Sequence, residues 1–356
     1  MRRTLALLAL LLLVASCAAG RQHSRWLGLD TAQYHLQTGL LFLERDKPED
    51  ARRELLLAAE LDAGCGLAYC GLTVACAGLA RFEEARQHLT KARWLAKDDQ
   101  AKCQVRVAAM RLLTAERPTG WLEDAEDLYV QARAACPDDP APAYFMALAY
   151  KGGLRLEEAA ALLAEVCQTG GDYTARAAEQ WRLVERARRS SPRTPLGREL
   201  APRESLSRGE LAALLNAELG LGGRWSGPEP ADLAQHRLKD QVLPVLALGL
   251  DPLRPYADGT FHPDAPVSRA EFAQLVEALL ASWRPGSLER SRPARPPYPD
   301  VPQDAPHLRA LGLCGMRGLL EVRDLYTGAL EPNAPLSGAD ALLAIGRLRE
   351  QRGPTR

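Results

Sequence analysis

The sequence predicts an all-α protein: a repetitive helical solenoid followed by a compact helical module. Aromatic residues make up only 6% of the 356 residues, while alanine and leucine are abundant, which favours helices over a β-sandwich. Small and large apolar residues also recur at fixed offsets through the first half. In the second half, helix starts of one pattern occur three times. A chain of this length is expected to form two or three domains.

Composition excludes several classes of function. The formal net charge is zero, with 45 basic and 45 acidic residues, so the basic excess of a general nucleic-acid binder is missing. The sequence contains no glycine-rich phosphate loop, no nucleophile with a recognisable base and no cysteine–histidine spacing typical of a metal site. We therefore expect a protein that is not an enzyme and that needs neither a cofactor nor a metal.

The N-terminus has the pattern of a targeting segment. Met1–Arg3 carries positive charge, and the apolar run Leu5–Val14 is too short to span a bilayer. The run ends in Val-Ala-Ser-Cys at Cys17, which resembles the lipobox of bacterial lipoproteins. The resemblance implies that residues 1–17 are a signal peptide and that Cys17 is lipidated, in the outer membrane if the cell has two. The alternative is an ordinary signal peptide with an incidental cysteine.

Residues 30–189 contain a repeat with a period of 34 residues. The offsets recur, with one insertion of six residues, in these sets: Gly39, Phe42, Ala51, Leu55 and Ala58; Ala85, Leu89 and Ala92; Ala125, Tyr129 and Ala132; Ala147, Tyr150, Ala159 and Leu163. A helix-turn-helix period with small residues at the helix crossings resembles the tetratricopeptide (TPR) repeat family. The resemblance implies about four units, with a capping helix near residues 172–188, and a concave surface for a protein or peptide partner. A spacer role is the alternative.

Two cysteines of the third repeat are candidates for a disulfide. Cys103 is expected early in the first helix of this unit and Cys136 at the end of the second. Antiparallel pairing of the two helices brings these ends together. An exported protein can oxidise such a pair, so we expect a Cys103–Cys136 disulfide.

Beyond a linker at residues 190–200, one pattern occurs three times. The copies are PRESLSRGELAALL at 202–215, PDAPVSRAEFAQLV at 263–276 and PNAPLSGADALLAI at 332–345. Each contains a serine with an acidic residue three positions later, which is the spacing of a capping box at a helix start. The first copy lacks a recognisable helix upstream, whereas an acidic turn and a helical stretch precede the other two.

The second copy resembles the S-layer homology (SLH) family. The likeness rests on Asp258–Phe261 (DGTF), on Pro263 and on Ser268–Glu271 (SRAE). It implies three units, at about 201–220, 231–282 and 298–349, packed around a shared axis. It also implies that grooves between units bind an anionic cell-wall polysaccharide or a peptidoglycan-linked polymer.

An arginine in the first turn of the helix in the first two copies suggests how an anion is bound. Arg269 and Arg208 occupy a turn where the helix dipole disfavours a cation, unless an anion lies between the guanidinium and the free N–H groups. The expected glycan-binding set also contains these four residues: Asp258, Gly259, Glu271 and Glu210. The third copy has lost its arginine, so at most two sites are expected. The alternative is that Arg269 pairs with Glu271 or Asp264 at the surface.

These features predict a non-catalytic lipoprotein of the cell envelope. Its partners would be the membrane through the lipid, the cell-wall glycan through the SLH units, and a protein through the TPR repeats. The main alternative is an envelope assembly factor in which the TPR arm is active and the SLH units are only structural. A more distant alternative is a glycan hydrolase that uses Asp258 and Glu271.

Overall fold

The computed structural model describes residues 31–221, 223–283, 298–323 and 326–352. The predicted signal peptide, Cys17 and most of the connector between the last two copies lie outside these ranges. Within them the regular structure is helical, apart from two isolated β-bridges, Ser207–Pro266 and Ser268–Pro335. No helix of the described residues has the length and apolar character needed to cross a membrane. The all-α prediction is therefore confirmed.

The chain divides into two compact units. Of the described residues, 31–153 and 162–175 form the first unit, called the arm below; those in 154–161 and from 176 to 352 form the second, called the module. The division passes through α9 (Leu156–Thr169).

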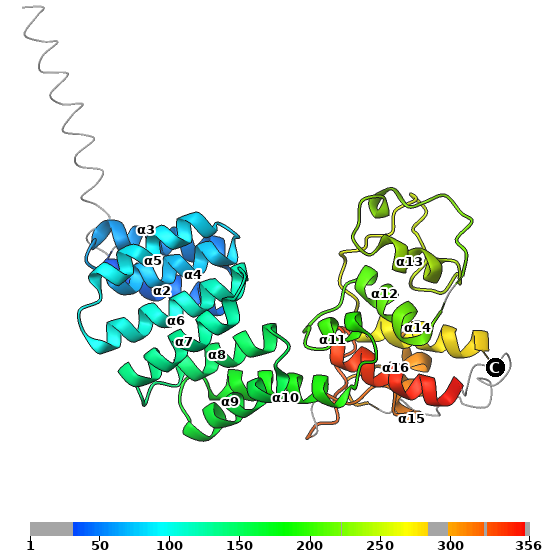
Figure 1. Cartoon of the computed structure of the whole chain (residues 1–356). Coiled ribbons are helices and arrows are strands. Elements are labelled where there is room, and N and C mark those ends of the chain that lie inside the picture. Colours follow the sequence, from blue (N-terminus) through cyan, green and yellow to red (C-terminus); the bar gives the residue numbers. More distant parts are fainter. Residues whose placement is uncertain (1–30, 222, 284–297, 324–325, 353–356) are drawn as a thin grey trace, which may run out of the picture. The chain divides into compact units, whose positions relative to one another are not determined.

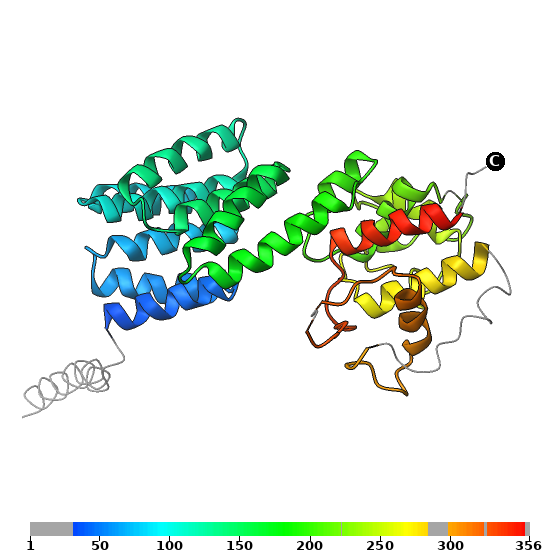
Figure 2. The same cartoon turned by 90° about the horizontal axis from the view of Figure 1, so that it is seen from below.

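The arm consists of antiparallel helix pairs stacked on one another. Its helices are coloured blue to green and are labelled in Figure 1, and Figure 2 shows them side by side. They are α2 (Ala32–Glu44), α3 (Pro48–Leu61), α4 (Gly66–Gly78), α5 (Phe82–Leu95), α6 (Asp99–Glu116), α7 (Trp121–Ala135) and α8 (Ala141–Gly152).

The repeated small residues lie at the helix crossings of the arm. Ala51, Leu55 and Ala58 are fully buried in α3, and their counterparts in α5 and α7 at the alanine positions are buried as well. A Cβ atom on Gly39 would lie 2.5 Å from Leu55 Cγ, so only glycine permits this approach of α2 to α3. The periodic residues thus set the distance between neighbouring helices.

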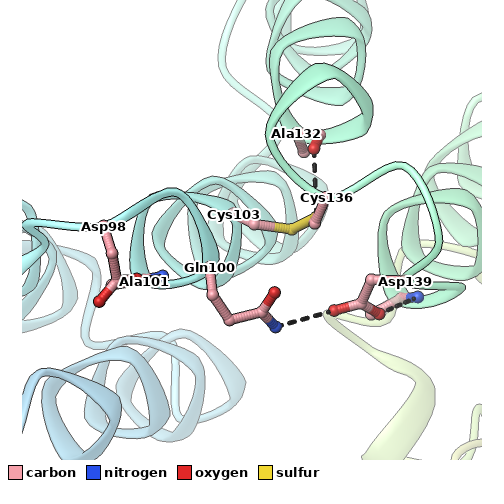
Figure 3. Close-up of a disulfide and its surroundings, with 8 residues drawn as sticks. Asp98, Gln100, Ala101, Cys103, Ala132, Cys136 and Asp139 are labelled. Carbon is pink, nitrogen blue, oxygen red and sulfur yellow. Dashed lines mark hydrogen bonds between the residues drawn. A yellow bond between two sulfur atoms is a disulfide. The ribbon is translucent and has the colours of Figure 1, made fainter.

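A disulfide joins the two helices of the third pair (Figure 3). Cys103 lies in the first turns of α6 and Cys136 follows the last residue of α7, and their Cα atoms are 6.1 Å apart. This is the pairing that the sequence analysis expects. Closing a loop with a sequence separation of 33 residues stabilises the folded state by about 3–4 kcal/mol in the chain-entropy model.

The described part of the module contains four long helices and three shorter ones. The long helices are α10 (Thr174–Arg189), α12 (Arg208–Leu219), α14 (Arg269–Trp283) and α16 (Gly338–Arg352); the shorter ones are α11 (Pro195–Leu200), α13 (Lys239–Leu246) and α15 (Leu308–Met316), with a 3₁₀ turn at Ala231–Leu233. One continuous apolar cluster runs through the long helices.

Two boundaries differ from the sequence expectation. Most of α10 belongs to the module, although we expected residues 172–188 to cap the arm. Residues 190–200, expected to be a linker, include α11, whose Leu200 is fully buried in the module core. Two helices, α10 and α11, therefore lie in the module before α12, although the sequence pattern of the first copy showed no helix upstream.

Candidate functional site

The three related segments meet in a closed ring of backbone hydrogen bonds. The Leu206 N–H donates to the Leu336 carbonyl at 2.9 Å, Leu336 donates to Val267 at 2.8 Å, and Val267 donates to Leu206 at 3.0 Å. These residues occupy the same position in the three copies, immediately before the capping serine. The ring therefore fixes the three helix starts around one axis.

The predicted capping boxes are confirmed in the first two copies. Ser207 and Glu210 form both bonds of the box at the start of α12. At the start of α14, the Glu271 N–H donates to Ser268 Oγ at 3.2 Å, and the Ser268 N–H donates to the Glu271 carboxylate at 2.7 Å. Both glutamates are half-buried, and this capping is a structural use of their carboxylates.

Arg208 is buried against the loop of the second copy. Its guanidinium donates to three backbone carbonyl groups, at Phe261 (2.9 Å), Pro252 (2.7 Å) and Arg254 (3.1 Å). The guanidinium carbon also lies over two aromatic rings, 5.0 Å from the ring centroid of Tyr256 and 4.9 Å from that of Phe261. Arg208 therefore holds the loop by hydrogen bonds and cation–π contacts.

Arg269 is fully buried and holds the loop of the third copy in the same way. It donates to the carbonyl groups of Leu330 and Glu321, and to Asp340 Oδ2 at 2.6 Å. Burial lowers the pKa of Arg269, whereas the charge of Asp340 raises it. An arginine remains protonated in such a site, so this is a buried ion pair.

These contacts correct the expectation that the two arginines lie open beside the helix ends. The backbone N–H groups at the helix starts are also occupied. The backbone N–H of Arg208 donates to the Ala265 carbonyl, and that of Arg269 donates to the Ala334 carbonyl. The surface-pair alternative is wrong too, since the partner of Arg269 is Asp340. The physical reason is that ring closure turns each first helical turn towards the next segment. Glycan binding by Arg208 and Arg269 stays a prediction. Neither guanidinium group is exposed to solvent, so the structure gives it no support.

The third segment closes the ring without an arginine. A Cβ atom on Gly338 would overlap the Leu200 carbonyl oxygen, so glycine is needed for the close approach of α11. Asp340 occupies the position of Glu210 and Glu271, but it pairs with arginines instead of completing a capping box. Its carboxylate lies 2.6 Å from the guanidinium group of Arg269. It also contacts the guanidinium groups of Arg186, at 3.1 Å, and of Arg323, at 3.5 Å.

The loop of the second copy is held from inside. Phe261 is fully buried, and its N–H and that of His262 donate to the carboxylate of Asp232. Asp258 is exposed and accepts from the Thr260 N–H and hydroxyl, while Gly259 has a positive φ of 81°. Asp258 and Gly259 thus form a turn, and these contacts lower the pKa of Asp258.

The same arrangement recurs in the third copy. The carboxylate of Asp300 accepts from the N–H groups of Leu330 and Glu331 at 3.0 and 2.7 Å. The sequence contains the signal for both aspartates, an acidic turn about 30 residues before each loop, but their role in holding the loop was not expected.

A pocket of about 490 Å³ lies where the third segment meets the first. One wall is α10 and the other is the loop of the third segment with the turn at Glu204 and Ser205. The charged residues of its lining are Glu179, Arg182, Arg186, Glu204, Arg323 and Glu331. This pocket was not predicted from the sequence, because α10 was expected to cap the arm and the third copy was expected to lack a site.

A second polar cluster lies in the arm. Glu84 accepts from Arg52 at 2.6 and 3.0 Å, His88 Nε2 is 3.7 Å from Glu84, and the thiol of buried Cys76 completes the group. Burial lowers the pKa of His88 and raises that of Cys76 to about 11. Arg52 already supplies the positive charge that balances Glu84, so the cluster is explained as a partly exposed ion pair.

The comparison with protein families agrees with part of this description. The family model described as "S-layer homology domain" matches residues 253–273, which contain the loop and the start of α14. No curated protein matches the chain. The chain thus carries an SLH domain within an all-helical protein. Such a domain suggests binding to cell-wall polysaccharide and a cell-surface location in the envelope.

Proposed function

We propose that this protein is a non-catalytic lipoprotein of the cell envelope that binds the cell wall through three SLH units. Its wall ligand is an anionic polysaccharide or a peptidoglycan-linked polymer. Its TPR arm binds a protein partner or spaces the module from the membrane. The observation that carries the proposal is the SLH match at residues 253–273.

The ring supports the assignment of three units. The matched segment shares its capping serine and its loop-holding carboxylate with the third segment, and its capping box and buried arginine with the first. Backbone hydrogen bonds at equivalent residues connect all three. A single unit has too little core to be stable alone, so closure of three is physically reasonable.

The arm and the N-terminus support the remaining parts. The 34-residue period and the buried small residues at the crossings favour TPR repeats. The lipid anchor rests on the sequence alone, on the apolar run Leu5–Val14 followed by Cys17.

Sedimentation with purified sacculi tests the wall-binding proposal. The chain from residue 18 onward, which lacks the lipid, is expected to pellet with sacculi and to stay in solution without them. Soluble wall polymer added in excess should release it. A chain that remains in the supernatant with every wall preparation contradicts the proposal. If that chain also captures a specific envelope protein, the assembly-factor alternative gains support.

A further inference from the structure

The pocket between α10 and the third segment contains charges of both signs. Its six charged lining residues are three arginines and three glutamates. The volume of about 490 Å³ is in the range of sites for small molecules. The lining therefore has no excess of positive charge, which a site for a purely anionic polymer would need.

Three of the six charges are already bound by the protein. Arg186 donates to Asp340 at 3.1 Å and to the Val322 carbonyl at 3.3 Å. Arg323 donates to the Pro335 carbonyl at 3.2 Å. Glu204 accepts from Gln180 at 2.9 Å, a bond that connects α10 to the opposite wall. These contacts fix the shape and the inner part of the pocket.

The other three charges are exposed and available. In the described part of the chain, the side chains of Glu179, Arg182 and Glu331 form no hydrogen bond and no ion pair. Glu179 and Arg182 are three residues apart on α10, so they lie on one face of the helix. Glu331 belongs to the opposite wall.

This arrangement discriminates between ligands by charge. A ligand with carboxylates alone meets the unpaired Glu179 and Glu331, and a ligand with amines alone meets the three arginines; in both cases like charges oppose binding. A group that carries an ammonium and a carboxylate on one carbon satisfies both signs. The ammonium can donate to the free glutamates, and the carboxylate can accept from Arg182, whose planar guanidinium suits it.

We propose that this pocket binds the free amino-acid end of a cell-wall stem peptide, through Arg182 for the carboxylate and through Glu179 and Glu331 for the ammonium. The inference rests on the proposed wall-binding function and names peptidoglycan peptide as the ligand at this position. It also makes the third junction, which lacks a first-turn arginine, the one that recognises the wall.

Calorimetric titration of the chain from residue 18 onward tests the inference. The probe is an N-acetylmuramyl tripeptide that ends in meso-diaminopimelate, and the comparison ligand is the same compound with its free amine acetylated. We expect the probe to bind and acetylation to weaken binding at least tenfold. Arg182→Ala and Glu331→Gln should each weaken it about tenfold, because each removes one charge-assisted contact. Arg198→Ala, at an exposed arginine of α11 outside the pocket, is the matched control and should leave binding unchanged.

Several outcomes separate this inference from the proposed function. Equal binding of free meso-diaminopimelate supports the recognition chemistry and assigns it to that group alone. Absent binding of the probe, or binding that neither acetylation nor the two variants change, overturns the inference. If the chain still pellets with sacculi in that case, the wall-binding proposal stands; if it does not, both fail.

Discussion

The arm and the module use the same kind of element, the helix, but they are held together in different ways. In the arm, each helix packs against its neighbours in the chain, and small residues at a regular period permit the close crossings. In the module, three segments up to about 130 residues apart close a ring, and buried arginines hold the loops of the next segment. A repeated residue therefore keeps one role in the arm, whereas in the module a repeated position changes its role from copy to copy.

Arg269→Ala should have the largest effect on the module. The substitution leaves the buried carboxylate of Asp340 with weaker partners and frees two buried carbonyl groups, so we expect a loss of about 3–5 kcal/mol in the free energy of unfolding. Denaturant unfolding measures it. Arg309→Ala is the matched control, because Arg309 also pairs with a carboxylate at 2.6 Å but is exposed. It should cost at most about 1 kcal/mol. Similar losses in the two variants would contradict the inference that buried Arg269 holds the loop of the third copy.

Gly338→Ala should disrupt the contact between the start of α16 and the end of α11 at Leu200. Its methyl group would overlap the Leu200 carbonyl, and we expect a loss of about 1–3 kcal/mol or more, because a backbone group cannot move aside easily. Gly346→Ala in the same helix is the control. Apart from the chain neighbours and the adjacent backbone of its own helix, no atom of the described residues lies within 4 Å of the added Cβ, so the substitution should stabilise the protein by about 0.5–1 kcal/mol. Opposite signs of the two changes in melting temperature are the expected result; equal signs would count against closure at Gly338.

The smallest expected effect is a pH dependence in the arm. Burial lowers the pKa of His88 in the folded state below its usual value of 6.5, so the unfolded chain takes up the proton first. The stabilising contribution is complete above pH 6.5 and is lost as the pH falls below this value. His88→Gln should remove the part of the slope that lies below pH 6.5. Unchanged slopes in thermal unfolding of the variant would show that other groups cause it.

Much of the arm was predictable because its determinants are local. The 34-residue period located the helix pairs, and Gly39, Ala51 and Leu55 lie at crossings as their offsets suggest. The pairing of Cys103 with Cys136 followed from the antiparallel arrangement of two consecutive helices. The boundary at α10 was missed because its residues fit an amphipathic helix equally well in either unit.

In the module, the capping boxes were predictable and the orientation of the arginines was not. Ser207, Glu210, Ser268 and Glu271 interact across one helical turn, so the sequence contains both partners of each bond. The partners of Arg269 lie 52 to 71 residues away, and no local pattern indicates them.

By itself, the sequence determined the helical class, the repeat period of the arm, the helix starts of the module and its likeness to an SLH domain. All of these can be recognised in short stretches of sequence, either within one helix and its preceding loop or by comparing one helix pair with the next along the chain. Only the tertiary structure decided which way Arg208 and Arg269 point, to which unit most of α10 belongs and where a pocket forms. Ring closure brings distant segments into contact, and the burial that results decides whether a charged side chain meets solvent or a backbone carbonyl.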